Sequence, residues 1–263
     1  MPERSSTAAF PTLDAAGAVH MQVARGIAHV RFGHPKSNSL PGSVLASLAE
    51  TISRAGARDD ARVVLLSSYG SGAFCAGASF DELVAIQDER QGKEFFMGFA
   101  RVILAMTRCP LPIVTRVHGK AVGGGVGVVA ASDYCVAART ASLRLSELAV
   151  GIGPFVVGPV IERRVGAGAF AAMAIDADWR DAAWGAQHGL YAQVCESGEL
   201  DAAVEALVAR LAISNPDALQ QIKRITWQGT EHWDALLSER AAVSGSLVLS
   251  AFTRDAIAKF AAR

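Results

Sequence analysis

Residues 118–133, HGKAVGGGVGVVAASD, place three consecutive glycines between a short apolar strand and a helix of small residues. Residues 113–117 predict the strand, and the residues from Gly124 onward predict the helix. The first N–H groups of a helix have no intrahelical partner, and the helix dipole favours negative charge there. Because glycine lets a ligand oxygen approach the backbone closely, we expect a main-chain N–H of this corner to meet a developing anion.

Two phosphate-binding motifs fit these glycines poorly. A P-loop requires GxxxxGK[ST], but Ala121 stands at the Ser or Thr position and Val114 at the first glycine. A dinucleotide fingerprint requires GxGxxG, but Val128 and Val156 replace the last glycine of the two candidate stretches. An oxyanion hole for carbonyl chemistry remains, and it needs a second N–H donor from elsewhere in the chain.

A second glycine-containing corner supplies a candidate for that donor. Residues 62–67 predict a buried strand, and residues 68–79 form a loop of small residues. Ser79 is a suitable N-cap for a helix that begins at Phe80 with acidic residues in its first turn. A long helical crossover joins the two corners, so they should lie side by side in a parallel sheet.

The segments GAFCAGASFDEL (72–83), PLPIVTRVHGKAVGGGVG (110–127) and ASLRLSELAVGIGP (141–154) resemble the crotonase, or enoyl-CoA hydratase/isomerase, family. The resemblance runs through nearly the whole chain and begins at HPKSNSLP (34–41), which is similar to the family's Arg-Pro-x-x-x-Asn-Ala-Leu motif. It implies an α/β fold, a crotonase-like spiral of ββα units followed by a C-terminal α-helical region. By the same resemblance, the N–H groups of Ala78 and Gly124 would form an oxyanion hole for the thioester oxygen of an acyl-coenzyme A.

The catalytic carboxylates depart from the pattern of the family's hydratases. Those hydratases use two glutamates, and this chain matches one of them with Glu147 but has Gly127 at the other position. A single carboxylate suits an isomerase, which removes a proton from one end of an allylic unit and returns it to the other. Some hydratase-like relatives also carry glycine at the first position. Since Gly127 follows Gly124 by three residues, we expect both to lie on the side of the helix that looks into the site.

The resemblance also implies how the rest of an acyl-CoA would be held. Lys36 and Lys259 would meet the phosphates of coenzyme A, the backbone at Ala76 would bracket the adenine, and Phe260 would pack on the ligand. Bulky residues at 154–158 should reshape the acyl pocket, whereas Asp81, Glu82 and Asp133 have simpler capping or anchoring roles. The expected catalytic set is Glu147, Ala78 and Gly124, and the expected substrate-binding set is Lys36, Ala76, Gly77, Gly123, Gly127, Phe155, Lys259 and Phe260.

Composition argues against several other classes of function. The chain has 263 residues, 51% of them hydrophobic, and 25 basic residues balance 25 acidic ones, so we expect no nucleic-acid or membrane partner. The four cysteines have no CxxC or metal-ligand spacing, which is typical of reduced thiols in a cytoplasmic protein. The N-terminus lacks the apolar stretch of a signal peptide, and no 18-residue apolar run is present. No metal or cofactor is expected beyond the coenzyme A of the substrate.

The pattern of expected elements, together with the family resemblance, divides the chain into three parts. Residues 1–17 are expected to be a flexible lead-in, residues 18–198 a crotonase-like core, and residues 199–263 a helical region for capping or oligomerisation. In the core we expect a hairpin (18–23 and 27–32), helix 43–55, and a helical stretch 80–107 broken near Gly92. From Pro154 onward only helices are expected. The family resemblance implies a homotrimer or homohexamer.

The most favoured activity at this point is that of a 2-enoyl-CoA hydratase, which adds water reversibly through an enolate held in the oxyanion hole. The alternatives are a Δ3,Δ2-enoyl-CoA isomerase that uses a single glutamate, and a non-catalytic homologue that only binds acyl-CoA. Decarboxylation and thioester hydrolysis stay open.

Overall fold

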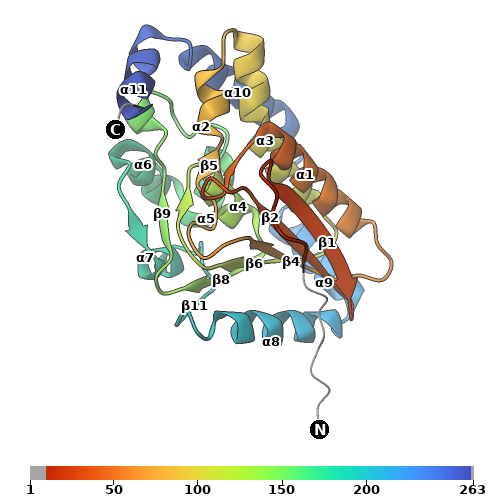
Figure 1. The fold of residues 1–263 in the computed structure, drawn as a ribbon. Helices are drawn as coiled ribbons and strands as arrows, with labels where there is room; N and C mark the ends of the chain where they lie inside the picture. Colours follow the sequence, from red (N-terminus) through yellow and green to blue (C-terminus); the bar gives the residue numbers. More distant parts are fainter. Residues whose placement is uncertain (1–9, 262–263) are drawn as a thin grey trace.

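The computed structural model describes residues 10–261, and a six-stranded sheet in the order β1–β2–β4–β6–β8–β11 forms its centre (Figure 1). The first two strands are the expected antiparallel hairpin, and every later neighbour pair in this sheet is parallel. The strands are β1 (Ala18–Ala24), β2 (Ile27–Gly33), β4 (Val63–Ser68), β6 (Ile113–Val117), β8 (Tyr134–Ala138) and β11 (Gln193–Cys195).

Two smaller sheets carry the loops that surround the site. One pairs β3 (Ser39–Leu40) with β5 (Gly77–Ala78) in parallel. The other has the order β10–β9–β7 and consists of β7 (Ala121–Val122), β9 (Ser142–Arg144) and β10 (Arg180–Asp181). Because neighbouring strands are parallel, the chain crosses over and returns to the same end of the sheet before each new strand. The corners that follow the strands therefore lie along one edge of the sheet.

Helices cover both faces of the main sheet. The larger hydrophobic core lies on the face with α1 (Gly42–Gly56), α3 (Glu89–Arg108) and α4 (Gly124–Ala131). A smaller core lies under α8 (Leu200–Ala212), which runs along the other face (Figure 1). The remaining helices are α2 (Phe80–Val84), the 3-10 turn η1 (Leu148–Val150), α5 (Gly158–Val165), α6 (Ala167–Asp176), α7 (Ala182–Gln187), α9 (Pro216–Thr226), α10 (Trp233–Leu247) and α11 (Ala251–Ala261).

The expected break in the helical stretch 80–107 is present, but it does not lie at Gly92. The break lies between α2 and α3 at residues 85–88, where Asp88 caps α3 by accepting the N–H of Gln91 at 2.7 Å. Gly92 is buried within α3, and a β-carbon on it would lie 2.7 Å from the Cα of Gly245 in α10. This glycine therefore allows two helices to cross closely instead of ending one.

The expectation of helices alone after Pro154 is also wrong. Two short strands, β10 and β11, interrupt the helices, and β11 extends the main sheet by pairing in parallel with β8. Each has only two or three residues, which is too short for alternation of polar and apolar side chains to be recognised in the sequence. The first nine residues of the expected lead-in lie outside the described part of the chain.

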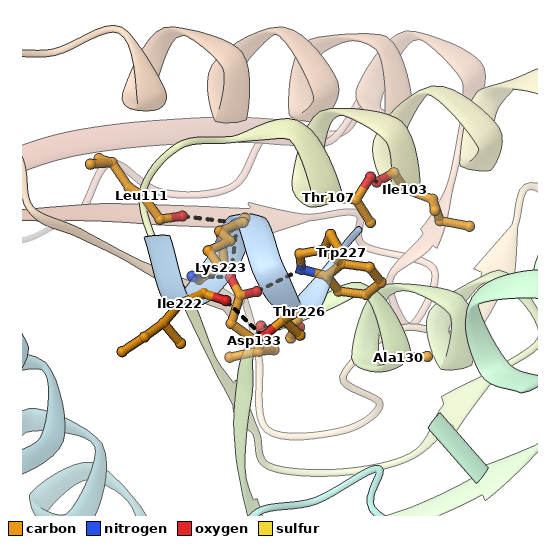
Figure 2. A network of polar contacts seen from close by, with 12 residues as sticks. Ile103, Thr107, Leu111, Ala130, Asp133, Ile222, Lys223, Thr226 and Trp227 are labelled. Carbon is orange, nitrogen blue, oxygen red and sulfur yellow. Dashed lines mark hydrogen bonds and ion pairs between the residues drawn. The ribbon is translucent and has the colours of Figure 1, made fainter. Parts of the chain in front are cut away.

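Asp133 has the anchoring role expected for it (Figure 2). Its carboxylate accepts the backbone N–H of Ile113 and the indole N–H of Trp227, each at 2.8 Å. The same carboxylate forms an ion pair with the buried Lys223, whose ammonium also donates to the carbonyl of Leu111. This network ties α9 to the start of β6 and to the end of α4, so it fixes the strand and the helix that flank the triple glycine.

Among the described helices, none alone has the length and apolar character needed to cross a bilayer. Only α10 and α11 taken together meet that test of length and composition, and a bend of 76° separates them.

Candidate active site

A pocket of about 400 Å³ opens between the two glycine-containing corners. Both corners line it, as do α3, η1, the segment after η1 and Ser244 of α10. Its wall is largely apolar and rich in aromatic side chains, namely Phe80, Phe95, Phe96, Phe99, Phe155 and Trp179. Glu147 is the one acidic residue among the described residues that line it.

Each of the three consecutive glycines meets a different steric demand. Gly123 has φ +53° and ψ −116°, a conformation that side chains rarely adopt, and a β-carbon there would lie 2.9 Å from Oε1 of Glu147. A β-carbon on Gly124 would lie 2.3 Å from the ring of Phe99, and one on Gly125 would lie 2.5 Å from the carbonyl oxygen of Cys75. The corner therefore has no room for a side chain at any of its three glycines.

The second corner is fastened to the first by backbone hydrogen bonds. The N–H of Val122 donates to the carbonyl of Cys75 at 2.9 Å. Gly77 has φ +96°, and a β-carbon on it would lie 4.0 Å from the backbone nitrogen of Gly124. Asn38 stabilises the same loop, because its buried amide donates hydrogen bonds to the carbonyls of Tyr69 and Ala73. The asparagine of the early sequence motif thus positions the second corner.

The structure brings the two expected N–H donors to the same pocket. Ala78 ends β5, Gly124 begins α4, and both line the pocket beside Glu147. As the first residue of its helix, Gly124 has an N–H group without an intrahelical partner. Two N–H groups from adjacent corners are the arrangement that an oxyanion hole requires.

Glu147 lies where a carboxylate can exchange protons with a bound substrate. It precedes η1, and its carbonyl accepts the N–H of Ile152 at 3.0 Å, which fixes the turn. Its Oε2 atom is buried and has no hydrogen-bond partner among residues 10–261. Burial raises the pKa of this carboxyl to about 7, because the charged form loses its hydration. Near neutral pH the group can therefore accept or donate a proton.

Gly127 does not line the pocket, which corrects its expected place in the substrate-binding set. It is buried, and a β-carbon on it would lie 2.6 Å from Cγ1 of Val157 and 3.3 Å from Cδ1 of Ile103. Val157 itself lines the pocket. The valine therefore stands between this glycine and the substrate space, and the bulky residues expected to reshape the pocket do so here.

The three acidic or nucleophilic side chains near the second corner have other roles. Asp81 pairs with Lys36, and Glu82 accepts the N–H of Gly42 at 2.9 Å, so neither carboxylate lines the pocket. Burial raises the pKa of the Cys75 thiol to about 12, which keeps it protonated at neutral pH. Glu147 is therefore the acidic group among the described lining residues that could exchange a proton with a ligand in the pocket.

The residues expected at the coenzyme A end are only partly assembled. Ala76, Gly77, Gly123 and Phe155 line the pocket as expected. Lys36 and Lys259 are exposed and do not line it. The side chain of Phe260 lies outside what the structure describes. Their roles toward coenzyme A stay predictions of the resemblance.

Several lining residues were not expected from the sequence. Arg144 lines the pocket, and its guanidinium carbon lies 5.7 Å from the ring centre of Trp179, which also lines it. Phe95, Phe96 and Phe99 of α3 form one wall of the pocket. The sequence indicated that this helix is apolar on one side, but it did not indicate that this side faces the site. Within the described residues, no group of three or more His, Cys, Asp or Glu side chains is placed to hold a metal ion.

Comparisons with known proteins identify the family and the fold of the chain. The family model for enoyl-CoA hydratase/isomerase matches residues 22–256, so the chain belongs to that family. An enoyl-CoA hydratase from Mycobacterium avium superposes with a TM-score of 0.83 at 26% identity, covering 95% of this chain and 97% of the other. The expected crotonase fold is thereby confirmed.

Two curated relatives differ in how much they share with the chain. The Rhodobacter capsulatus protein named "Probable enoyl-CoA hydratase" is 26% identical over 92% of this chain and 94% of its own length. A Mycobacterium tuberculosis protein, named (7aS)-7a-methyl-1,5-dioxo-2,3,5,6,7,7a-hexahydro-1H-indene-carboxyl-CoA hydrolase, is 32% identical over 48% of this chain. That match spans about half of the hydrolase's length (51%). The family acts on acyl-CoA substrates.

Proposed function

We propose that this member of the enoyl-CoA hydratase/isomerase family moves the double bond of an enoyl-CoA from C3–C4 to C2–C3. Glu147 is the single proton-transfer group in this reaction. The observation that carries the proposal is the isolation of Glu147: it is the one carboxylate among the described lining residues, and its Oε2 has no partner there. An isomerisation needs no second acid, because the proton that leaves one carbon is returned to another.

The proposed reaction begins with a 3-enoyl-CoA whose thioester oxygen accepts the N–H groups of Ala78 and Gly124. Glu147 removes a proton from C2, and the electrons of that C–H bond pass into a dienolate with negative charge on the thioester oxygen. The protonated Glu147 then delivers the same proton to C4, and the double bond comes to rest between C2 and C3. A pKa near 7 matches both halves of this cycle, since the base must also be able to act as the acid.

Hydration of a 2-enoyl-CoA is the second candidate, and the relative from Rhodobacter capsulatus supports it through its name and its nearly full-length match. In hydration, Glu147 would take a proton from a water molecule that attacks C3, and a proton would then have to reach C2. Gly127 stands at the position of the hydratases' other glutamate, and Val157 fills the space between this glycine and the pocket. Hydration would therefore depend on Glu147 for both transfers, which makes it the less favoured of the two reactions.

The wall of the pocket supports an apolar acyl group. Six aromatic side chains surround the space. Among the described lining residues, the charged ones are Glu147 and Arg144. Burying apolar surface against such a wall stabilises the complex by about 25 cal/mol per Å². A cytoplasmic location and a trimeric or hexameric assembly stay predictions.

The test is a pair of absorbance assays on the purified protein, one with a 3-enoyl-CoA and one with crotonyl-CoA. Isomerisation produces the conjugated thioester absorbance from the first substrate, and hydration removes it from the second. We expect the first signal to be the faster of the two. Rapid hydration without isomerisation would place the hydratase reaction first. Silence in both assays, with acyl-CoA binding intact, would indicate a binding protein that has lost turnover.

A further inference from the structure

A second pocket of about 400 Å³ lies on the other face of the main sheet, next to α8. Leu65 and Val204 line it, and both belong to the smaller hydrophobic core under that helix. Unlike the first pocket, it is lined mainly by polar and charged side chains. We call it the polar pocket, and the residues used below are Arg31, Ser67, Ser68, Arg116, Asp201 and Glu205.

The polar pocket arises from the alternation of side chains along parallel strands. On the α8 face of β2 and β4, apolar Ile27 and Val63 at the strand starts are followed by Arg31 and Ser67 at the strand ends. The strands are in register, with Arg31 directly beside Ser67. Polar groups therefore collect at the carboxyl ends of the strands, which is where open α/β sheets bind ligands.

Ser67 supplies a hydroxyl group at this end of the pocket. The residue is 6% exposed and lines the pocket on the α8 face. The side chain of Ser68, the next residue of β4, lies on the opposite face with Val64 and Leu66 of the larger core. Its hydroxyl is buried there without a hydrogen-bond partner among the described residues, so a ligand in the polar pocket does not reach it. Ser67 is therefore the hydroxyl donor that a ligand in this pocket could use.

Arg31 holds a positive charge at the same end of the pocket. Its guanidinium carbon lies 4.6 Å from the ring centre of Phe10 and 5.5 Å from that of Tyr69, so two aromatic faces fix its position. Its Nε donates to the Ser67 hydroxyl over a long 3.4 Å. Within residues 10–261 it forms no ion pair with a carboxylate. An oriented guanidinium with free N–H groups is suited to a planar or tetrahedral oxyanion.

The other charges around the pocket are compensated or lie at its rim. Arg116 donates to Asp201, so this pair contributes little net charge. Glu205 is exposed on α8 and is the acidic residue of the lining that has no ion pair within the described part of the chain. The field inside the pocket is thus positive at Arg31 and becomes negative toward the solvent side of α8.

We propose that the polar pocket is a second binding site, distinct from the acyl-CoA pocket, for a small oxyanion. A carboxylate or phosphate group would accept hydrogen bonds from the Arg31 guanidinium and from the Ser67 hydroxyl. The inference does not depend on the reaction proposed above, because none of these residues lines the first pocket.

The experiment measures the thermal unfolding midpoint against increasing inorganic phosphate, and separately acetate, at constant ionic strength with coenzyme A present. A ligand that binds only the native protein raises the midpoint, and the concentration dependence gives an apparent Kd. Arg31→Gln should weaken binding about tenfold or more, since it removes charge-assisted hydrogen bonds. Arg54→Gln is the matched control, because it removes the same charge from an exposed position on α1.

Two further variants separate a binding role from a structural one. Ser67→Ala removes the hydroxyl that would donate to the oxyanion and leaves the Arg31 charge in place, so oxyanion affinity should fall about threefold to tenfold. Glu205→Gln should tighten binding, because a neighbouring negative charge is removed. Equal phosphate and acetate affinity in wild type, Arg31→Gln and Ser67→Ala would overturn the proposal. So would weaker binding in Glu205→Gln, which would indicate a cation in the pocket.

Discussion

The first and second turns of α4 use glycine for opposite purposes. In the first turn, Gly123 and Gly124 leave the backbone open to the pocket, and Glu147 lies directly opposite them. In the second turn, Gly127 is sealed by Val157. The first turn keeps what anion stabilisation needs, whereas the second has been closed where hydratases of the family carry a further glutamate. A glycine in a motif can therefore mark either the approach of a ligand or a packing contact.

The comparison assigns proton transfer to Glu147 alone, and the largest expected effect tests this assignment. Glu147→Gln keeps the size of the side chain and removes the base, so turnover should fall by roughly 10²–10⁴. The measurement is kcat on a 3-enoyl-CoA, with Glu162→Gln on the exposed surface of α5 as the matched control. A Glu147→Gln protein that keeps most of its activity would move the chemistry elsewhere and remove the contrast between the two turns.

The oxyanion contacts at the first turn come next in size. Proline deletes a backbone N–H group, so Ala78→Pro should lower kcat by about 10²–10³ while Gly124 still supplies one donor. Thermal unfolding and acyl-CoA binding are measured on the same protein, so that only a folded variant counts. A folded Ala78→Pro variant with full kcat would show that this corner is a turn without a catalytic N–H.

The burial of Glu147 should appear in the pH dependence of stability. Its pKa is raised from 4.5 to about 7 in the folded protein. Between these values the unfolded chain binds fewer protons than the native protein, so the free energy of unfolding falls as the pH rises. Glutamine has no such proton, so Glu147→Gln should gain up to about 3 kcal/mol relative to wild type between pH 4 and pH 8. Urea unfolding of both proteins at pH 4 and pH 8 measures this difference. The same change in the free energy of unfolding in wild type and in Glu147→Gln would show that the Glu147 carboxylate is hydrated in the folded protein.

The same pKa predicts the pH profile of catalysis. The base must be ionised to remove the C2 proton, so kcat/KM should rise with pH and level off above about 7. A profile that levels off near pH 4.5 would assign the proton transfer to a solvated carboxylate.

The smallest effect concerns the second turn. Gly127→Glu would force a side chain against Val157, so we expect a loss of stability of about 1–3 kcal/mol and no gain in hydration. Gly168→Glu on α6 is the control, because a β-carbon there meets nothing within 4 Å. Faster hydration by a stable Gly127→Glu protein would show that the second turn still opens toward the substrate.

The sequence predicted those parts of the site that depend on local pattern. The two corners, and the strand and helix that flank the triple glycine, were visible because turn residues and apolar periodicity are short-range signals. Glu147 was identified through the family resemblance. The place of Gly127 was not, since it is decided by Val157, which lies 30 positions further along the chain. The helical rule that Gly127 shares a side with Gly124 ignored what fills that side. Gly92 was misread for the same reason, because its partner Gly245 belongs to a distant helix.

The fate of a deuterium label at C2 shows whether a single group removes the proton and returns it. A 3-enoyl-CoA deuterated at C2 is converted in ordinary water, and the product is examined by mass spectrometry and proton NMR at C4. If a single buried Glu147 removes and returns the proton, part of the deuterium must appear at C4 of the 2-enoyl-CoA, and Glu147→Gln must abolish that transfer. Product formed with no deuterium at C4, at a rate that Glu147→Gln leaves unchanged, would contradict the account.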